Sequence, residues 1–181
     1  MRWLLIFALF AAGPLAAQDS ALENILKHGE LRVGLEAGYM PFEMRDRKGD
    51  IIGFDVDLAR LMARSMGVKL TLVNTQWDGI LAALLTDKFD LLMGGMTITP
   101  ERNLKVNFAD PYVLIGQTIV LNKKWAATVK SYRDLNSPKY PIATKRGPTG
   151  DIACHKVPPP AARQPIESDA AAAPDVRRGP A

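Results

Sequence analysis

The residues best suited to binding chemistry lie between Gly94 and Arg102, in the order Gly-Gly-Met-Thr-Ile-Thr-Pro-Glu-Arg. Two successive glycines let backbone amides approach a ligand closely, and Thr97 adds a hydroxyl. Thr99 followed by Pro100 predicts the start of a helix. Arg102 would lie in the first turn of that helix, where a cation opposes the helix dipole. A bound carboxylate would explain this placement, because a guanidinium donates two parallel hydrogen bonds to it. Taken alone, a solvated surface arginine explains it equally well.

Three aromatic residues, Tyr39, Phe42 and Trp77, fall at the predicted ends of strands. Their faces could enclose an apolar or cationic side chain, although each alone fits a hydrophobic core as well. Together with Arg102 they predict one amino-acid pocket that combines a carboxylate clamp with an aromatic sandwich.

The elements that would position these residues alternate between strands and helices. Hydrophobic periodicity and turn residues predict a helix at 22–29, a strand at 30–35, a hairpin at 43–53, a helix capped by Asp55 and closed by Gly67, a strand at 68–73, a helix capped by Asp78, and a strand at 91–93. This order predicts an α/β fold with an open, mostly parallel sheet. Ligands bind beyond the carboxyl ends of such strands, where the loops around Tyr39 and Gly94-Gly95 would lie.

A second α/β unit begins further along the chain. The apolar run at 112–121 is long enough to cross from one domain to another, and 131–135 with 140–144 predict a further helix and strand. The predicted organisation is a signal peptide at 1–17, a first lobe at 18–115, a crossover or hinge at 116–122, the start of a second lobe at 123–157, and a Pro/Ala-rich tail at 158–181. We expect the tail to be poorly ordered, because its prolines interrupt helix formation.

Composition narrows the class of protein. The 181 residues are 48% apolar and 23% charged, which is typical of a globular protein, and the net charge of +4 includes no dense basic run that would predict nucleic-acid binding. Cys154 is the single cysteine, so an internal disulfide is impossible. With His28 and His155 as the two histidines, we expect neither a metal site nor a cofactor.

The first residues have the pattern of a secretory signal. Arg2 is followed by an uncharged stretch that ends in Ala16-Ala17. That stretch is shorter than the roughly 20 apolar residues that a spanning helix needs. The pattern predicts a cleavable signal peptide and a periplasmic protein.

Four ordered motifs resemble one family. They are Gly53-Phe54-Asp55-Val56-Asp57-Leu58-Ala59, Trp77-Asp78-Gly79-Ile80, the segment from Gly94 to Arg102, and Phe108-Ala109-Asp110-Pro111-Tyr112. Together they resemble bacterial periplasmic solute-binding proteins of family 3, which bind polar amino acids for ABC transporters. The likeness extends from about Leu22 to Asp151, and it implies a two-lobed type II fold with a nearly complete first lobe and an incomplete second lobe.

The resemblance also implies roles for particular residues. The arginine matching Arg102 would bind the ligand α-carboxylate, helped by Gly95 and Thr97, while Tyr39 and Trp77 would flank the ligand side chain.

Two positions depart from the pattern of the family. Gly94 and Gly95 replace hydroxyl residues of many members, so that backbone contacts alone remain there. In the second lobe the resemblance implies Thr149 as a carboxylate donor, but Pro148 removes a backbone amide.

Relatives place the acidic residue for the ligand α-amino group on a later second-lobe strand, and their chain then returns to the first lobe. This sequence ends before either element, so we expect a C-terminally truncated and weakly binding form, with no residue assigned to the α-amino group.

The function predicted is periplasmic amino-acid binding by two closing lobes, as a monomer that delivers its ligand to an inner-membrane ABC permease. One alternative is an enzyme similar to cyclohexadienyl dehydratase, which would need Glu36 or Glu43 as a general acid. Another is the sensor module of a receptor. The sequence does not decide which amino acid is bound, although Lys145 weakly disfavours cationic ligands.

Overall fold

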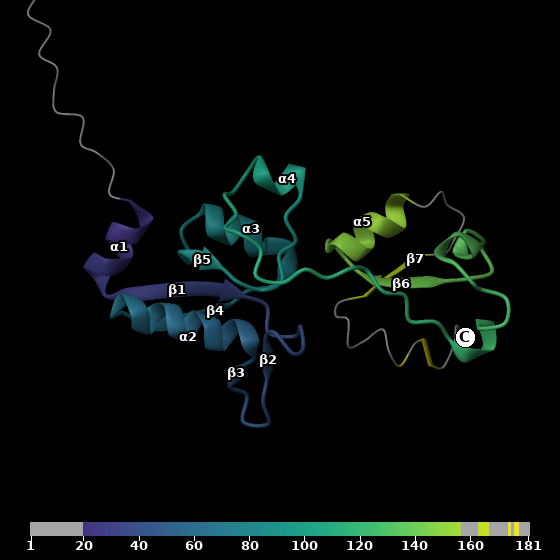
Figure 1. Cartoon of the computed structure of the whole chain (residues 1–181), viewed down its shortest axis with the longest axis horizontal. Helices are drawn as coiled ribbons and strands as arrows, with labels where there is room; N and C mark the ends of the chain where they lie inside the picture. The colour runs from purple at the N-terminus through teal and green to yellow at the C-terminus, as the bar shows by residue number, and fades with distance from the viewer. Residues whose placement is uncertain (1–19, 157–162, 167–173, 175, 178–181) are drawn as a thin grey trace, which may run out of the picture.

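The computed structural model describes residues 20–156, 163–166, 174 and 176–177, which form two lobes side by side along the long axis (Figure 1). The predicted signal peptide at 1–17 lies outside the described residues, as does most of the predicted tail.

The first lobe is built on a parallel sheet of three strands, β1 (Glu30–Leu35), β4 (Lys69–Asn74) and β5 (Leu91–Leu92), in the order β4-β1-β5. Val33 of the central strand is opposite Leu72 on one side and Leu91 on the other. Val33 and Leu35 are fully buried, as expected for a strand covered on both faces. The predicted parallel α/β architecture is confirmed.

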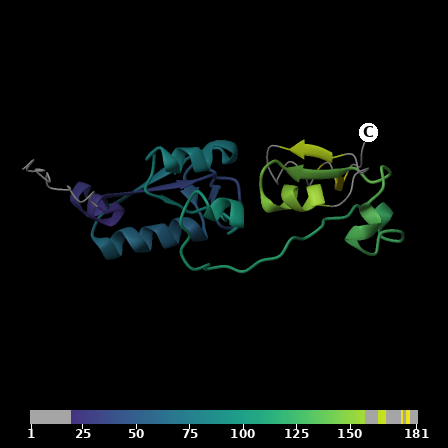
Figure 2. The ribbon, with the colours of Figure 1, turned by 90° about the horizontal axis from the view of Figure 1, so that it is seen from above.

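Helices cover this sheet on both faces. They are α1 (Ala21–His28), α2 (Phe54–Met66) and α3 (Trp77–Leu85). The predicted hairpin is also present and consists of the antiparallel strands β2 (Met44–Arg45) and β3 (Ile51–Ile52). In Figure 2 α2 lies on one side of the strands and α3 on the other. Two buried clusters result, one around Val33 and Ala59 and one around Ile80 and Phe89.

The predicted N-caps of α2 and α3 are wrong. The N-cap of α2 is Gly53, whose φ of 137° is open to glycine and rarely to other residues, so the helix begins before Asp55. Asp55 is fully buried instead of capping. The N-cap of α3 is Gln76, so Asp78 lies inside the first turn. The positive end of the helix dipole stabilises a carboxylate there as well.

The second lobe is smaller and contains the 3₁₀ turns η1 (Lys123–Trp125) and η2 (Tyr132–Leu135), the strands β6 (Ile142–Lys145) and β7 (Arg163–Ile166), and the helix α5 (Thr149–Lys156). β6 and β7 are parallel neighbours. The structure therefore differs from the expected poor order of the tail at Arg163–Ile166. A strand with a neighbour on one side tolerates Pro165, because its outer edge needs no backbone donor.

A long irregular segment joins the lobes. After the one-turn helix α4 (Pro100–Asn103), no regular strand or α-helix forms until the second lobe, and Figure 2 shows the chain running extended between the two. The apolar residues of this segment are largely exposed, including Leu114 at 88% and Val120 at 72%. The predicted crossover at 116–122 falls within it.

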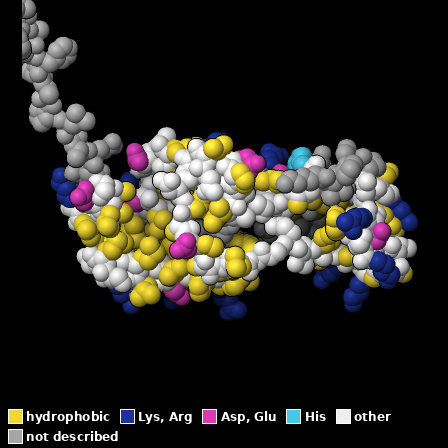
Figure 3. Space-filling model, turned by 45° about the horizontal axis from the view of Figure 1, so that its top comes forward, with side chains coloured by type: hydrophobic (Ala, Val, Ile, Leu, Met, Phe, Trp, Pro, Cys, Tyr) yellow, Lys and Arg dark blue, Asp and Glu magenta, His cyan; other side chains and the backbone are white. Residues whose placement is uncertain are grey.

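Hydrophobic side chains also gather on the outer surface of the first lobe over α1 and α2 (Figure 3), where Leu22, Leu26, Phe54 and Leu61 are exposed. Within the described residues, no helix is long and apolar enough to cross a membrane.

Candidate functional site

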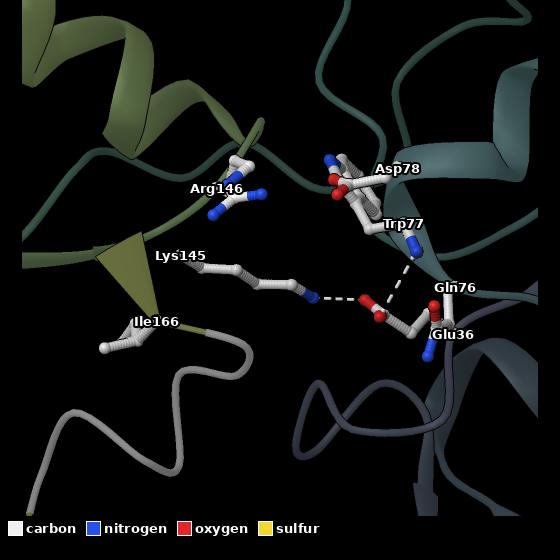
Figure 4. Close-up of a pocket in the computed structure, with 7 residues that line it drawn as sticks. All are labelled: Glu36, Gln76, Trp77, Asp78, Lys145, Arg146 and Ile166. Carbon is white, nitrogen blue, oxygen red and sulfur yellow. Dashed lines mark hydrogen bonds and ion pairs between the residues drawn. The ribbon is translucent and has the colours of Figure 1, made fainter. Parts of the chain in front are cut away.

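The carboxyl ends of β1, β4 and β5 point toward the second lobe, and a cavity of about 120 Å³ lies where the lobes meet. Its lining comes from both lobes and consists of Glu36, Gln76, Trp77, Asp78, Lys145, Arg146 and Ile166 (Figure 4). The position agrees with the rule that open α/β sheets bind ligands beyond their strand ends.

An ion pair crosses this cavity. Figure 4 shows the Lys145 ammonium, from the end of β6, pointing at the carboxylate of Glu36, from the loop after β1. The Lys145 Nζ also lies 5.4 Å from the centre of the Trp77 ring, within cation–π range. Glu36 accepts a further hydrogen bond of 3.2 Å from the Trp77 backbone N–H. Lys145, which the sequence placed at the rim, therefore occupies the cavity itself.

Arg102 lies near the same aromatic ring, with its guanidinium carbon 5.6 Å from the centre of Trp77. One guanidinium nitrogen donates to the Thr97 carbonyl at 2.8 Å, and the other donates to the Gly147 carbonyl of the second lobe at 3.4 Å. Burial lowers the pKa of Arg102, and Glu101 opposes this shift. An arginine remains charged nonetheless, so a half-buried cation faces the junction of the lobes.

Local structure explains how Arg102 is held. The Thr99 hydroxyl accepts a hydrogen bond from the Arg102 backbone N–H at 3.3 Å, and Pro100 opens the helix. The helix α4 has only four residues, so the predicted conflict with a helix dipole carries little weight. Hydrogen bonds to Thr97 and Gly147 orient the side chain instead.

Threonine hydroxyls meet across the lobes beside Arg102. Thr97 Oγ1 and Thr149 Oγ1 are 3.4 Å apart, and Gln117 donates to Thr149 at 2.9 Å. Thr149 is the first residue of α5. The predicted residues Arg102, Thr97, Trp77 and Thr149 thus lie together at the junction.

The two remaining glycines and Tyr39 form a neighbouring group. Gly95 has φ 62°, and a Cβ added there would lie 2.7 Å from the Tyr39 ring, so any larger residue would clash. The Tyr39 ring also stacks on Phe42 at 5.3 Å. Of the two aromatic residues predicted to sandwich the ligand, Trp77 alone lines the cavity, while Tyr39 packs against the glycine loop.

Sequence reasoning did not select Gln76, Asp78, Arg146 or Ile166 as site residues. Gln76 and Asp78 follow β4, and Arg146 follows β6. The strand-end rule that selected Trp77 after β4 would also have found Gln76 and Asp78, and the same rule applied to β6 would have found Arg146. Ile166 ends β7, which falls in the expected tail.

Comparison with known proteins agrees with this geometry. Residues 31–173 match the model of the bacterial extracellular solute-binding proteins, family 3. Because the match covers most of the chain, this protein belongs to that family.

Two relatives illustrate the functions found among similar proteins. Cyclohexadienyl dehydratase of Pseudomonas aeruginosa is 34% identical over 148 residues, which are 82% of this chain and 55% of the relative. ABC transporter arginine-binding protein 1 of Escherichia coli K12 is 33% identical over 149 residues, which are 82% of this chain and 56% of the relative. The chain therefore spans about half the length of these curated relatives.

Solved structures are similar in fold. The ancestral amino acid-binding protein AncCDT-1, a precursor of cyclohexadienyl dehydratase, has a TM-score of 0.83 and 47% identity, and the match covers 87% of this chain and 69% of that one. The arginine-bound, truncated ArgBP from T. maritima has a TM-score of 0.79 and 41% identity, with 87% and 73% covered. The two-lobed type II fold is confirmed.

Proposed function

We propose that this protein binds an amino acid between its lobes in the periplasm and delivers it to an ABC-transporter permease, acting as a monomer and without nucleic acid. The observation that carries the proposal is Arg102, whose guanidinium lies at the junction of the lobes. Its hydrogen bonds to the described residues use two of the five N–H donors of an arginine, which leaves donors for a ligand carboxylate. Membership of an extracellular family and the predicted signal at 1–17 support the periplasmic location.

The rest of the ligand would occupy the neighbouring cavity. Its side chain would lie over Trp77, with the Glu36 carboxylate at the far end, while Thr97 and Thr149 add hydroxyls near the carboxylate end. A cationic side chain fits best, because Glu36 and the Trp77 face already hold the ammonium of Lys145. The arginine-binding protein of Escherichia coli and the arginine-bound ArgBP support the same class of ligand.

The similarity to a dehydratase raises the alternative of catalysis, which we do not favour. Of the two candidate acids, Glu36 is ion-paired with Lys145, and Glu43 is 1% exposed and does not line the cavity. A general acid must reach the substrate oxygen that it protonates. An assay for turnover of an aromatic dehydratase substrate should therefore give no product.

Calorimetric titration of the chain with arginine, lysine, histidine, glutamine and glutamate tests the proposed function. We expect heat of binding for at least one amino acid, strongest for the cationic ones. Arg102→Ala should weaken binding by about 2–5 kcal/mol, because the ligand carboxylate would lose its charge partner. Arg47→Ala, exposed in the turn between β2 and β3 and outside the cavity, is the matched control and should change affinity by much less. Equal affinities of Arg102→Ala and the parent chain would overturn the assignment.

A further inference from the structure

Two acidic side chains are buried beside the glycine loop and are not explained by the cavity. Glu43 follows the turn that contains Tyr39, and Asp55 lies in the first turn of α2. Their exposed fractions are 1% and 0%, and no other charged residue among those described is buried to this degree. Buried acidic residues require compensation, because the interior solvates charge poorly.

Nearby donors compensate this burial only in part. The Tyr112 hydroxyl and the Gly95 backbone amide are close enough to favour the Asp55 anion, but neither completes a hydrogen bond of ordinary geometry to it. Within the described part of the chain, Glu43 Oε2 and both carboxyl oxygens of Asp55 lack a hydrogen-bond partner. Two ionised carboxylates in contact would repel strongly in this environment. A single proton between them removes one charge and gives one oxygen a donor, as in other closely paired carboxyl groups.

The electrostatics assign this proton to Glu43. Burial, followed by the neighbouring Asp55, raises the pKa of Glu43 to about 9. Burial also raises the pKa of Asp55, but the Tyr112 hydroxyl, Glu43 and the Gly95 backbone amide all act to lower it. Asp55 is therefore the better stabilised anion, and Glu43 is the partner that donates.

The pair lies directly against the loop that would receive the ligand carboxylate. A Cβ added to Gly94 would lie 3.3 Å from Glu43 Oε1, and the backbone amide of Gly95 is close enough to Asp55 to favour its ionised form. A second negative charge at this position would repel the ligand carboxylate and the loop carbonyls.

We propose that Glu43 and Asp55 share one proton and act as positioning residues that fix the Gly94–Gly95 loop for carboxylate binding. The inference rests on the proposed amino-acid-binding function. It predicts that ligand binding weakens at alkaline pH, when the shared proton is lost.

The other charged groups near the pair affect this titration in opposite directions. Glu36, after β1, raises the pKa of Glu43, whereas Lys145, from β6, lowers it. Tyr112, from the segment after α4, faces Asp55. Because the folded pKa of Glu43 exceeds its ordinary value of 4.5, its contribution to stability is fully present below pH 4.5 and is lost as pH rises toward about 9.

Glu43→Gln in the full chain tests the proposal, because its amide can still donate to Asp55 but cannot ionise. Arginine affinity is measured by calorimetry from pH 7 to pH 9.5 for the variant and the parent. The ligand amino group also titrates in this range and affects both proteins equally. The quantity compared is therefore the affinity of the variant divided by the affinity of the parent at each pH. We expect a ratio near one at pH 7 that rises about three- to fivefold by pH 9.5, as follows from titration of a group with a pKa of about 9.

Asp57→Asn is the matched control, since Asp57 lies two residues after Asp55 on α2 and its side chain is exposed. Its ratio to the parent should remain constant across the pH range. A constant ratio for Glu43→Gln as well would overturn the positioning role.

A second measurement does not depend on ligand binding or on the folding of the variant. The infrared spectrum of the parent chain should contain a protonated-carboxyl band at pH 7 that disappears as pH rises through about 9. Absence of that band at neutral pH would overturn the shared proton. If the band is present but no amino acid binds at any pH, the proposed function fails and with it the positioning role, while the buried proton stands.

Discussion

At the residue scale, Trp77 connects more parts of the site than any other side chain described above. Its ring is near the Arg102 guanidinium and the Lys145 ammonium, and its backbone N–H donates to Glu36. An aromatic face attracts cations through its quadrupole. Trp77 therefore provides a surface on which one cation can replace another.

This position makes Trp77 a reporter of binding. We expect arginine to change the tryptophan fluorescence of the parent chain, because the ligand cation would replace the Lys145 ammonium next to the Trp77 ring. Trp77→Leu should abolish this change. Trp125→Leu is the control, since Trp125 packs edge-on against Tyr140 in the second lobe, at 5.0 Å. Persistence of the full signal in Trp77→Leu would place the ligand elsewhere.

At the element scale, the parallel sheet depends on contacts that fix β1 relative to β5. Arg32 of β1 donates to Asp90, just before β5, through a backbone N–H at 2.8 Å and guanidinium nitrogens at 3.2 and 2.6 Å. Charged hydrogen bonds of this kind are stronger than neutral ones. They tie the start of the central strand to the edge strand whose far end leads into the Gly94–Gly95 loop.

Asp90→Asn should reduce the free energy of unfolding at neutral pH by about 1–2 kcal/mol. This value is at the low end for charged hydrogen bonds, because the Arg32 side chain is 37% exposed and solvent screens the pair. Urea denaturation provides the measurement. As the control, Asp57→Asn removes an exposed pair with Arg60 and should cost at most about 0.5 kcal/mol.

The same pair predicts a dependence on acid. Burial alone would raise the pKa of Asp90, but the Arg32 hydrogen bonds outweigh it and lower the pKa below its usual 3.8. The contribution is therefore present above pH 3.8 and lost as pH falls through the lowered value. If Asp90→Asn and the parent lose stability equally between pH 5 and pH 2, the pair does not carry this effect.

At the scale of the whole molecule, polar contacts join the two lobes at the site. Lys145 reaches Glu36, and Arg102 reaches the Gly147 carbonyl. The Lys145–Glu36 pair is well shielded, with side-chain exposures of 14% and 23%. Lys145 thus occupies the place proposed for a ligand cation and competes with it.

Removal of this competitor should strengthen binding of cationic ligands. We expect Lys145→Met to increase the affinity for arginine about tenfold relative to glutamine, because Glu36 is left without a charge partner until the ligand binds, and breaking a buried ion pair costs several kcal/mol. Paired titrations with both amino acids measure this selectivity. Lys139→Met, in the same lobe but near Trp125, is the control and should leave the selectivity unchanged. A uniform effect on both ligands would contradict the competition.

The sequence by itself determined the family, the order of elements and the parallel sheet, because these depend on local periodicity, turn residues and ordered motifs. It also selected Arg102, Thr97 and Trp77, since strand ends and helix starts can be recognised along the chain, and Thr149 through the resemblance to the family. It mistook Asp55 for a helix cap, because the pattern of a cap does not reveal whether a side chain is buried.

Only the tertiary structure decided which distant residues meet. Lys145 and Glu36 are 109 positions apart, and no local pattern pairs them. The buried neighbours Glu43 and Asp55 likewise become a pair only when the loop after β1 packs against the first turn of α2. Protonation and charge competition depend on distance and burial in space, and therefore could not be predicted from the order of residues alone.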